Sequence, residues 1–206
     1  MTTRVDHLET SGTFSLDGET HQVDNNVWVV GNDVECVVID APHDVHAILG
    51  AVGDRRVKAI LCTHAHDDHV RVAPQLRTQT SAPVFLHPDD RQLWELTHPD
   101  ELLDVDLGEG QVVEVAGVRM RVIHTPGHAP GAVCFYAEEL GELFTGDTLF
   151  AGGPGATGRS FSDRDTLVAS IRQRLFVLPD DTVVHTGHGP DTTIGAERHT
   201  LGLAEQ

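Results

Sequence analysis

Residues 57–69 of the chain read VKAILCTHAHDDH, an apolar run that leads straight into three imidazoles and two carboxylates. The nearly continuous apolar stretch is typical of a buried strand. Residues two apart in an extended loop point the same way, so His64 and His66 can address one metal ion together. Asp68 and His69 then turn away and can address a second ion. Imidazole and carboxylate ligands suit zinc, and also iron or manganese.

Three later segments share one form, an apolar strand followed by a small residue and then a metal-binding side chain. They read HTPGHAPG at 124–131, FTGDTLF at 144–150 and HTGHGP at 185–190. Glycine before each ligand lets the backbone turn and lets the ligand approach an ion closely. We therefore expect His128, Asp147 and His188 to complete the site. An aspartate in this position could bridge two ions and hold them roughly 3.5–4 Å apart.

The composition limits the class of protein. With 206 residues, 39% of them hydrophobic and 22% charged, the sequence predicts one globular domain over residues 1–206. The formal net charge of −18 argues against a nucleic-acid or anionic-membrane partner, because either would need a basic surface. A polar, acidic N-terminus and the lack of an apolar run of roughly 20 residues predict a cytoplasmic protein. Cys36, Cys62 and Cys134 each lie in an apolar run and are expected to be buried, reduced thiols.

Strands and helices are expected in mixed order along the chain. Asp17-Gly18 predicts a hairpin within 14–23, and further strands are expected at 27–30, 34–39, 57–62, 84–86, 111–115, 118–124, 132–137, 142–146 and 182–185. Helices are expected at about 44–52, 70–80, 89–96, 164–177 and 194–203, the fourth with Asp163 as its N-cap. A simple doubly wound sheet would alternate more strictly, so this order predicts layered α/β architecture with sheets packed inside helices.

Taken in this order and spacing, the motifs resemble the metallo-β-lactamase superfamily, and specifically its short glyoxalase II-like (hydroxyacylglutathione hydrolase-like) branch. The resemblance extends from the opening hairpin to His188. It implies an αββα sandwich of two mixed sheets flanked by helices. It also implies two divalent metal ions, most consistent with zinc, with iron or manganese as alternatives. By this resemblance the first ion is held by His64, His66 and His128, the second by Asp68, His69 and His188, and Asp147 bridges them.

The resemblance also implies a hydrolytic reaction. Two cations that share one water lower its pKa toward neutral, so that a hydroxide can attack a carbonyl carbon. The first ion would stabilise the oxyanion, while Asp68 and Asp147 orient the nucleophile as the catalytic carboxylates. The stretch GDTLF at 146–150 resembles the glyoxalase II group, whose members hydrolyse thioesters of a carrier thiol. We therefore expect a small-molecule thioester with a hydroxyacyl or formyl group as substrate, and a monomer or homodimer.

Recognition of the carrier thiol is expected to involve the loop GGPGATGRS at 152–160. Long-form glyoxalase II enzymes have an aromatic residue after the last histidine and a C-terminal helical domain. Here residues 189–191 read GPD, and the chain ends about 18 residues after His188. The loop resembles that of short bacterial members, some of which are associated with mycothiol, so glutathione and mycothiol are both candidates. Arg159 is the candidate for binding an anionic group of the thiol. The alternative is a salt bridge that rigidifies the loop.

Other reactions fit the same motifs. Persulfide dioxygenases of the superfamily use one iron held by two histidines and an aspartate, which here would be His66 or its neighbour, His128 and Asp147. Lactone hydrolysis would use the two-ion site. Hydrolysis of β-lactams is less consistent with the sequence, because no secretory signal is visible and His69 completes the hydrolase-type motif.

Three further histidines lie near these motifs. His124 and His185 are sequence neighbours of the ligand segments and are candidates for hydrogen bonding to ligands. His43, in the stretch DAPHD at 40–44, replaces a small residue that is common in the superfamily and is a candidate for the mouth of the site.

Overall fold

The computed structural model describes residues 2–203, which form two six-stranded sheets and one two-stranded sheet. The first sheet keeps the chain order and consists of β1 (Arg4–Leu16), β2 (Glu19–Gly31), β3 (Glu35–Ile39), β4 (Arg56–Leu61), β5 (Val84–Leu86) and β6 (Val105–Asp106). The second has the order β14-β13-β10-β9-β8-β7 and consists of β7 (Val112–Val115), β8 (Val118–His124), β9 (Val133–Ala137), β10 (Glu142–Gly146), β13 (Val183–Thr186) and β14 (Thr192–Thr193). The small sheet pairs β11 (Leu149–Phe150) with β12 (Gly153–Pro154).

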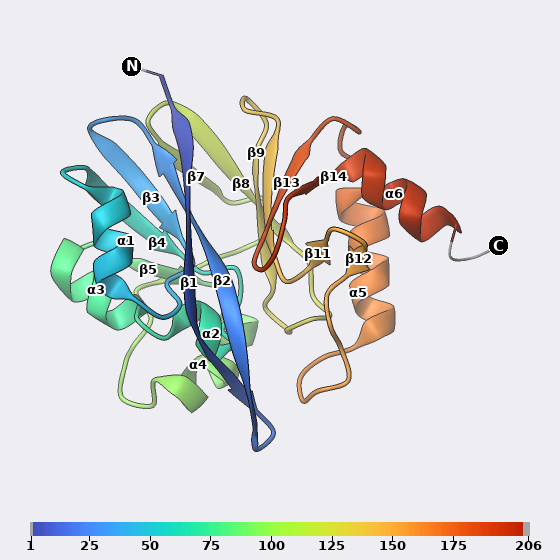
Figure 1. Ribbon diagram of the computed structural model, residues 1–206, viewed down its shortest axis with the longest axis horizontal. Coiled ribbons are helices and arrows are strands. Elements are labelled where there is room, and N and C mark those ends of the chain that lie inside the picture. The colour runs from blue at the N-terminus through green and yellow to red at the C-terminus, as the bar shows by residue number, and fades with distance from the viewer. Residues whose placement is uncertain (1, 204–206) are drawn as a thin grey trace.

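Helices cover the outer faces of both large sheets, as Figure 1 shows. On the first sheet they are α1 (Val45–Val52), α2 (Asp67–Val70), α3 (Ala73–Thr80), the 3₁₀ helix η1 (Pro88–Asp90) and α4 (Arg91–Thr97). On the second sheet they are α5 (Arg164–Ser170), the π-helical turn η2 (Ile171–Leu175) and α6 (Ile194–Leu203). The layers therefore run helix, sheet, sheet, helix, which confirms the αββα sandwich expected from the sequence.

Alternating side chains give the strands two buried faces. Val27 and Val29 of β2 pack in a cluster with α1, α3 and α4. Trp28 and Val30 of the same strand point the other way, into a cluster with Phe135 and other residues of the second sheet. A third cluster fills the space between the second sheet and α5, η2 and α6. Because the inner strands are covered on both faces, they read as continuous apolar runs.

Strand direction brings several loops to one edge of the molecule. β4 runs parallel to β3 and β5, and β10 runs parallel to β13. Loops that follow parallel strands therefore leave each sheet at the same edge. Backbone hydrogen bonds join these loops, from Val133 N to Thr63 O at 2.8 Å between the sheets and from Gly187 N to Gly146 O at 2.8 Å. This edge is where the candidate ligands meet.

The opening hairpin is longer than the sequence indicated. The turn lies at Asp17-Gly18 as predicted, but β1 begins at Arg4 and pairs with β2 over 13 residues, from Arg4↔Gly31 to Leu16↔Glu19. The segment 19–31, expected as two short strands, is one. Much of β1 is half-buried or exposed, so its sequence shows little hydrophobic alternation.

Two helices also differ from expectation. The helix expected at 70–80 is divided into α2, which carries Asp68 and His69, and α3. Pro74 lacks the N–H needed to continue one helix through this point. Asp163 does cap α5, by accepting a hydrogen bond from Thr166 N, but the regular helix ends at Ser170 and continues as η2.

The structure also bears on the cysteines and on membrane insertion. Cys36, Cys62 and Cys134 are buried and free, as predicted. Within residues 2–203, no helix combines the length and hydropathy needed to cross a bilayer.

Candidate metal centre

All seven side chains proposed as ligands converge at the edge where the two sheets meet. They are His64 and His66 from the loop after β4, Asp68 and His69 from α2, His128 from the loop between β8 and β9, Asp147 after β10, and His188 after β13. Only the assignment of Asp68 and His69 to a short helix, in place of an extended loop, differs from the expected local structure.

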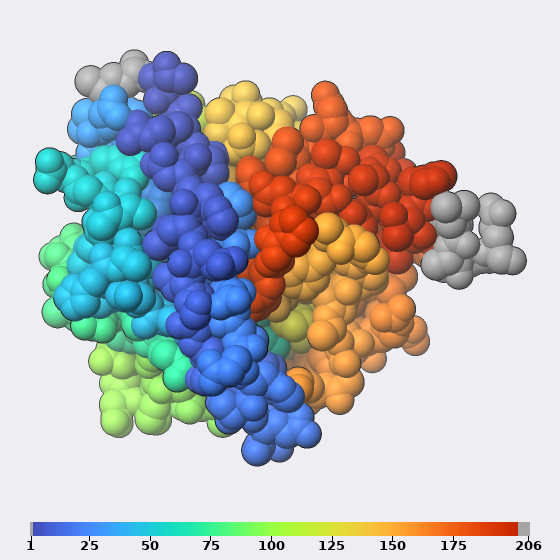
Figure 2. Space-filling view, viewed as in Figure 1, coloured from blue at the N-terminus to red at the C-terminus, as the bar shows by residue number. Residues whose placement is uncertain are grey.

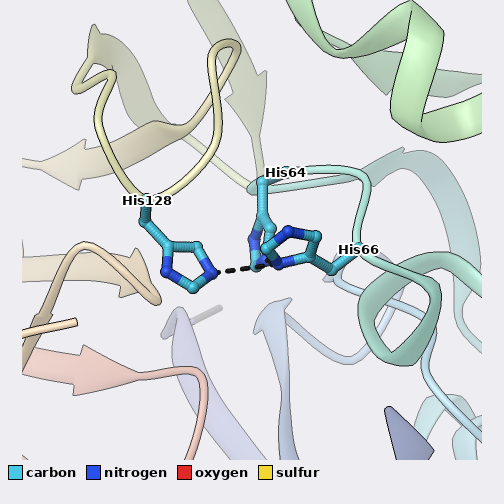
Figure 3. A group of neighbouring side chains, drawn as sticks. All are labelled: His64, His66 and His128. Atoms are coloured by element: carbon cyan, nitrogen blue, oxygen red, sulfur yellow. Dashed lines mark hydrogen bonds between the residues drawn. The ribbon is translucent and has the colours of Figure 1, made fainter. Parts of the chain in front are cut away.

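The three-histidine cluster consists of His64, His66 and His128, which Figure 3 shows with their rings pointing at one another. His66 Nδ1 lies 3.0 Å from His64 Nε2 and 3.0 Å from His128 Nε2. The rings stand nearly perpendicular to each other, with interplanar angles of 83–85°. Nitrogens bound tetrahedrally to zinc at about 2.0–2.1 Å lie roughly 3.3 Å apart, so this arrangement is close to that of a ligand set.

The Asp68 cluster consists of Asp68, His69 and His188. Asp68 Oδ2 lies 3.6 Å from His69 Nε2 and 3.4 Å from His188 Nε2, and the two nitrogens are 3.3 Å apart. Asp68 and His69 are at most 2% exposed. These separations again match the spacing of ligands around one ion.

Asp147 lies between the two clusters. Its Oδ1 is 3.3 Å from His69 Nε2, and its Oδ2 is 3.5 Å from His128 Nε2 and 3.4 Å from His188 Nε2. One carboxylate therefore reaches ligands of both clusters, as expected of a bridging group.

Four of the five imidazoles are oriented by a hydrogen bond from the ring nitrogen that points away from the cluster. The Nδ1–H groups donate from His64 to Thr63 Oγ1 (3.1 Å), from His69 to Asp40 Oδ2 (2.8 Å), from His128 to Ala156 O (2.8 Å) and from His188 to Asp24 O (2.6 Å). Each bond fixes the tautomer and leaves the Nε2 lone pair directed into the site. His66 is reversed and presents Nδ1.

A buried polar atom shows that a cation fits this site. Asp147 Oδ1, which lies 3.3 Å from His69 Nε2, is buried without a hydrogen-bond partner among the described residues. Buried polar atoms are ordinarily paired, so unpaired ones need an explanation. A divalent cation within each cluster would satisfy the converging lone pairs, and the imidazole and carboxylate donor set suits such an ion.

The pKa values differ between the clusters. Burial and the neighbouring His69 lower the pKa of His64 well below its usual range. Burial and the nearby His128 lower the pKa of His66 to about 3. Both imidazoles are therefore neutral at pH 7, which is the form that binds metals.

In the Asp68 cluster, charge outweighs burial. Burial would raise the pKa of Asp68, but attraction to His69 and hydrogen bonds from His188 and Asn25 hold it at about 2. Burial also opposes ionisation of Asp147, yet His188 and His69 keep its pKa well below the usual range. Against the same burial, Asp147 raises the pKa of His188 to about 10. The carboxylates of this cluster therefore favour bound positive charge.

A cavity of about 250 Å³ opens above the ligands. Its floor includes His66, Asp68, His128, Asp147 and His188. Its walls come from the β1–β2 hairpin and from the loop after β12, and consist of Phe14, His21, Val23, Ala156, Thr157, Arg159, Ser160 and Ser162. Figure 2 shows the end of the hairpin lying beside the segment coloured for residues 150–165.

Arg159 lies in the cavity wall as part of a contact with the hairpin. Its Nη1 is 3.1 Å from Glu19 Oε2, its Nη2 donates to His21 Nε2 at 2.8 Å, and its guanidinium stacks 5.4 Å from the centre of the Phe14 ring. Both sequence interpretations of Arg159 therefore have a counterpart in its position, as a cation at the cavity and as a salt-bridge partner.

Comparison with known proteins identifies the family. The sequence profile described as the Metallo-beta-lactamase superfamily matches residues 22–188. The chain belongs to the metallo-β-lactamase superfamily. It is 36% identical over 160 residues to the hydroxyacylglutathione hydrolase GloC of Haemophilus influenzae (strain ATCC 51907), covering 71% of this chain and 76% of that one.

Solved structures agree with this assignment. The crystal structure of BLEG-1 B3 metallo-beta-lactamase superimposes with a TM-score of 0.79 at 31% identity, covering 92% of this chain and 97% of that one. That of TTHA1623 in a di-iron-bound form gives a TM-score of 0.76 at 37% identity, covering 86% and 94%. The chain is thus a superfamily enzyme with the His and Asp groups that bind divalent metals.

Some residues of this superfamily site were not predicted from the sequence. Asn25 of β2 is fully buried, donates from Nδ2 to Asp68 Oδ2 at 3.0 Å, and accepts at Oδ1 from His43 Nε2 at 2.8 Å. His43 therefore lies behind Asn25 and outside the residues that line the cavity. The signal available in the sequence was a polar Asn25-Asn26 pair at the start of an apolar run.

Asp40 is a second residue that was not predicted. It accepts hydrogen bonds from Thr63 N (2.7 Å), Thr63 Oγ1 (2.8 Å) and His69 Nδ1 (2.8 Å). Its φ of 62° lies in the left-handed region, a strained conformation for a residue with a side chain. The strained backbone directs one carboxylate at both the loop after β4 and helix α2.

The neighbouring histidines have other partners. His124 donates from Nε2 to Pro130 O at 2.9 Å and stacks on His87, with ring centres 4.0 Å apart and an angle of 13°. These two rings and Asp89 lie close enough to suggest a second metal site, but parallel rings do not direct their in-plane lone pairs at one point. His185 contacts Asp191 at 3.0 Å. Within the described residues, neither His124 nor His185 forms a hydrogen bond to a candidate ligand side chain.

Gly187 shows why a small residue precedes a ligand. A Cβ at this position would lie 2.3 Å from Asp147 Oδ1 and 2.9 Å from His69 Cε1. The backbone before His188 therefore runs directly against the site, as the sequence motif indicated.

Proposed function

We propose that this superfamily member is a two-metal hydrolase that cleaves S-acyl thioesters of a low-molecular-weight thiol, with a hydroxyacyl or formyl group as the acyl part. The observation that carries the proposal is the convergence of seven candidate ligand side chains, five of which form the floor of one cavity. Similarity to a hydroxyacylglutathione hydrolase supports a thioester as the substrate.

In this proposal the three-histidine cluster holds one cation, the Asp68 cluster holds the other, and Asp147 contacts both. Zinc is the proposed metal, and iron or manganese suit the same ligands. When bound, the ions would supply a nucleophile at neutral pH and stabilise the charge that develops on the carbonyl oxygen.

The two carboxylates are proposed to orient the attacking water. Asp68 and Asp147 have pKa values far below 7, so both are ionised and can accept a hydrogen bond from that water. A thiolate leaves readily, so little proton transfer to the leaving group is needed. Glutathione and mycothiol are the candidate carrier thiols, and Arg159 in the cavity wall is proposed to bind a carboxylate of the carrier if that carrier is glutathione.

The test is zinc-dependent hydrolysis of S-lactoyl and S-formyl thioesters of glutathione and mycothiol, with a lactone and a β-lactam assayed on the same preparation. We expect turnover of at least one thioester. His66→Ala should lower kcat by more than the roughly 10–100-fold typical of changes outside the ligand set. His46→Ala, on the exposed face of α1, is the matched control. Failure of every thioester, or turnover of the lactone or β-lactam alone, would contradict the proposal.

A mononuclear iron persulfide dioxygenase is the second candidate. The relative that is 37% identical and was solved in a di-iron-bound form supports iron as a metal for such a site, and this candidate adds a one-iron state. The reaction would use His66 or its neighbour, His128 and Asp147. One ferrous ion per chain with oxygen uptake from a persulfide would support it, whereas two ions with thioester hydrolysis would argue against it.

A further inference from the structure

A buried carboxylate outside the ligand set contacts both loops of the three-histidine cluster. Asp90, the last residue of η1, is 0% exposed. Its Oδ2 accepts a hydrogen bond from Ala65 N at 2.8 Å, and its Oδ1 accepts one from Gly131 N at 2.5 Å. Ala65 lies between His64 and His66, and Gly131 lies in the loop that carries His128.

The fit around Asp90 is close on the side of the second sheet. A Cβ on Gly131 would lie 2.7 Å from Asp90 N and 2.9 Å from its Cγ. Any side chain there would push the His128 loop away from Asp90. Glycine at 131 is therefore needed for this contact, because no Cβ closer than 3.0 Å to another heavy atom can be accommodated without a shift.

Burial of the Asp90 carboxylate is energetically unfavourable. Transfer of an ionised carboxylate out of water is unfavourable, and burial raises the pKa of Asp90 to about 6. Two charge-assisted hydrogen bonds from backbone N–H groups offset this penalty. The two donors, at residues 65 and 131, are 66 residues apart in the chain. Both donors belong to loops that position metal ligands.

The Asp68 cluster has different anchors. Asp40 holds His69, Asn25 holds Asp68, and the backbone carbonyl of Asp24 holds His188. Within residues 2–203, the Asp90 side chain forms hydrogen bonds with Ala65 and Gly131 and with none of Asp68, His69 and His188. Asp40 also reaches His64 through Thr63, so the two clusters share that anchor, whereas the contacts of Asp90 belong to the three-histidine cluster.

We propose that Asp90 is a positioning residue for the three-histidine cluster alone. It holds the His64–His66 loop and the His128 loop at the separation that one cation needs, and so sets the affinity of that cluster. The inference rests on the two-ion part of the proposed function and adds a residue that controls one ion without controlling the other.

The experiment measures zinc affinity for each site by competition with a chromophoric chelator, with no substrate present. Asp90→Asn keeps the shape but turns an amide N–H₂ group toward a backbone N–H. This substitution should lower the affinity for one of the two zinc ions by roughly 10–100-fold and leave the affinity for the other at the wild-type value. Gly131→Ala disturbs the same contact from the His128 loop and should lower the affinity for the same zinc ion. Asp89→Asn, on the exposed neighbouring residue, is the matched control and should bind both ions normally.

A double variant shows which cluster binds the zinc ion whose affinity falls in Asp90→Asn. His128→Ala removes a ligand of the three-histidine cluster, so adding Asp90→Asn should not weaken the remaining ion further. Wild-type affinity at both sites in Asp90→Asn and Gly131→Ala, with only a lower Tm, would reduce Asp90 to a structural role and overturn the proposal. Equal weakening of both ions would also overturn it. Because zinc binding is measured alone, failure of the thioesterase assay leaves this test intact.

Discussion

Asn25 and Asn26 are adjacent residues with separate roles, because successive side chains of a strand point to opposite faces. Asn25 faces the metal centre and donates to Asp68 Oδ2 at 3.0 Å. Asn26 faces the second sheet and donates from Nδ2 to Thr186 O at 3.0 Å and Gly189 O at 2.9 Å. The first bond orients a ligand, and the others join β2 to the loop that carries His188.

The pair therefore predicts two different phenotypes. Asn25→Ala should lower kcat or zinc affinity by roughly 10–100-fold with a nearly unchanged Tm, because a group that orients a ligand is lost. Asn26→Ala should instead destabilise the fold by about 1–3 kcal/mol, because buried carbonyls lose their donor. Thermal unfolding and steady-state kinetics of both variants check this. The assignment fails if Asn25→Ala lowers Tm as much as Asn26→Ala while its zinc affinity and kcat stay at wild-type values.

At the residue scale, the sequence identifies the candidate ligands more readily than the residues that hold them in place. His64, His66, Asp147 and the other candidates each follow an apolar strand in a recognisable motif, and the structure brings them together. Asp90 and Asn25 act through contacts between distant parts of the chain, such as the 43 residues that separate Asn25 from Asp68. Nothing in a single sequence indicates which buried carboxylate or amide meets which loop.

Among the elements, the β1–β2 hairpin has the most direct effect on the cavity. Its end is joined to the loop after β12 by the Arg159–Glu19 ion pair and by a hydrogen bond from Ser160 N to Asp17 Oδ2 at 2.9 Å. Side-chain exposures of 33% for Arg159 and 64% for Glu19 place the pair in contact with water. Exposed ion pairs contribute little to stability, so an anionic ligand can compete with Glu19 for the guanidinium.

This competition predicts a charge-dependent effect on KM. Glu19→Gln should lower KM several-fold for the anionic S-lactoylglutathione and leave KM unchanged for the uncharged S-lactoyl-N-acetylcysteamine. Arg159→Gln should raise KM for the anionic substrate only. Glu95→Gln, exposed on α4 and outside the cavity lining, is the control. Equal changes for both substrates would show that the ion pair holds the cavity's shape and does not select charge.

The hairpin also shows where prediction of elements fails. The turn at Asp17-Gly18 was evident from its residue types, but residues 4–13 were not expected in a strand. β1 is the edge strand of its sheet, and many of its side chains are exposed to solvent. Apolar residues therefore do not alternate along it. Strands buried on both faces, such as β9, were predicted nearly residue for residue.

Considered as a whole, the molecule places the candidate metal centre across two sheets. The first sheet and its helices supply His64, His66, Asp68 and His69, and the second sheet supplies the other three ligands. The second sheet contributes one histidine to each cluster, His128 to the three-histidine cluster and His188 to the Asp68 cluster. Bound ions would therefore join the two halves of the sandwich. The layered architecture could be predicted from the order of strands and helices, but the way the halves meet depends on packing between distant strands.

Reconstitution of metal-free protein tests the central claim most directly. Zinc is added in steps, and hydrolysis of the preferred thioester is recorded together with the bound metal per chain. The two-ion account predicts that activity reaches its maximum at two equivalents per chain. Full activity at one equivalent, or activity that needs a single ferrous ion and consumes oxygen, would contradict it.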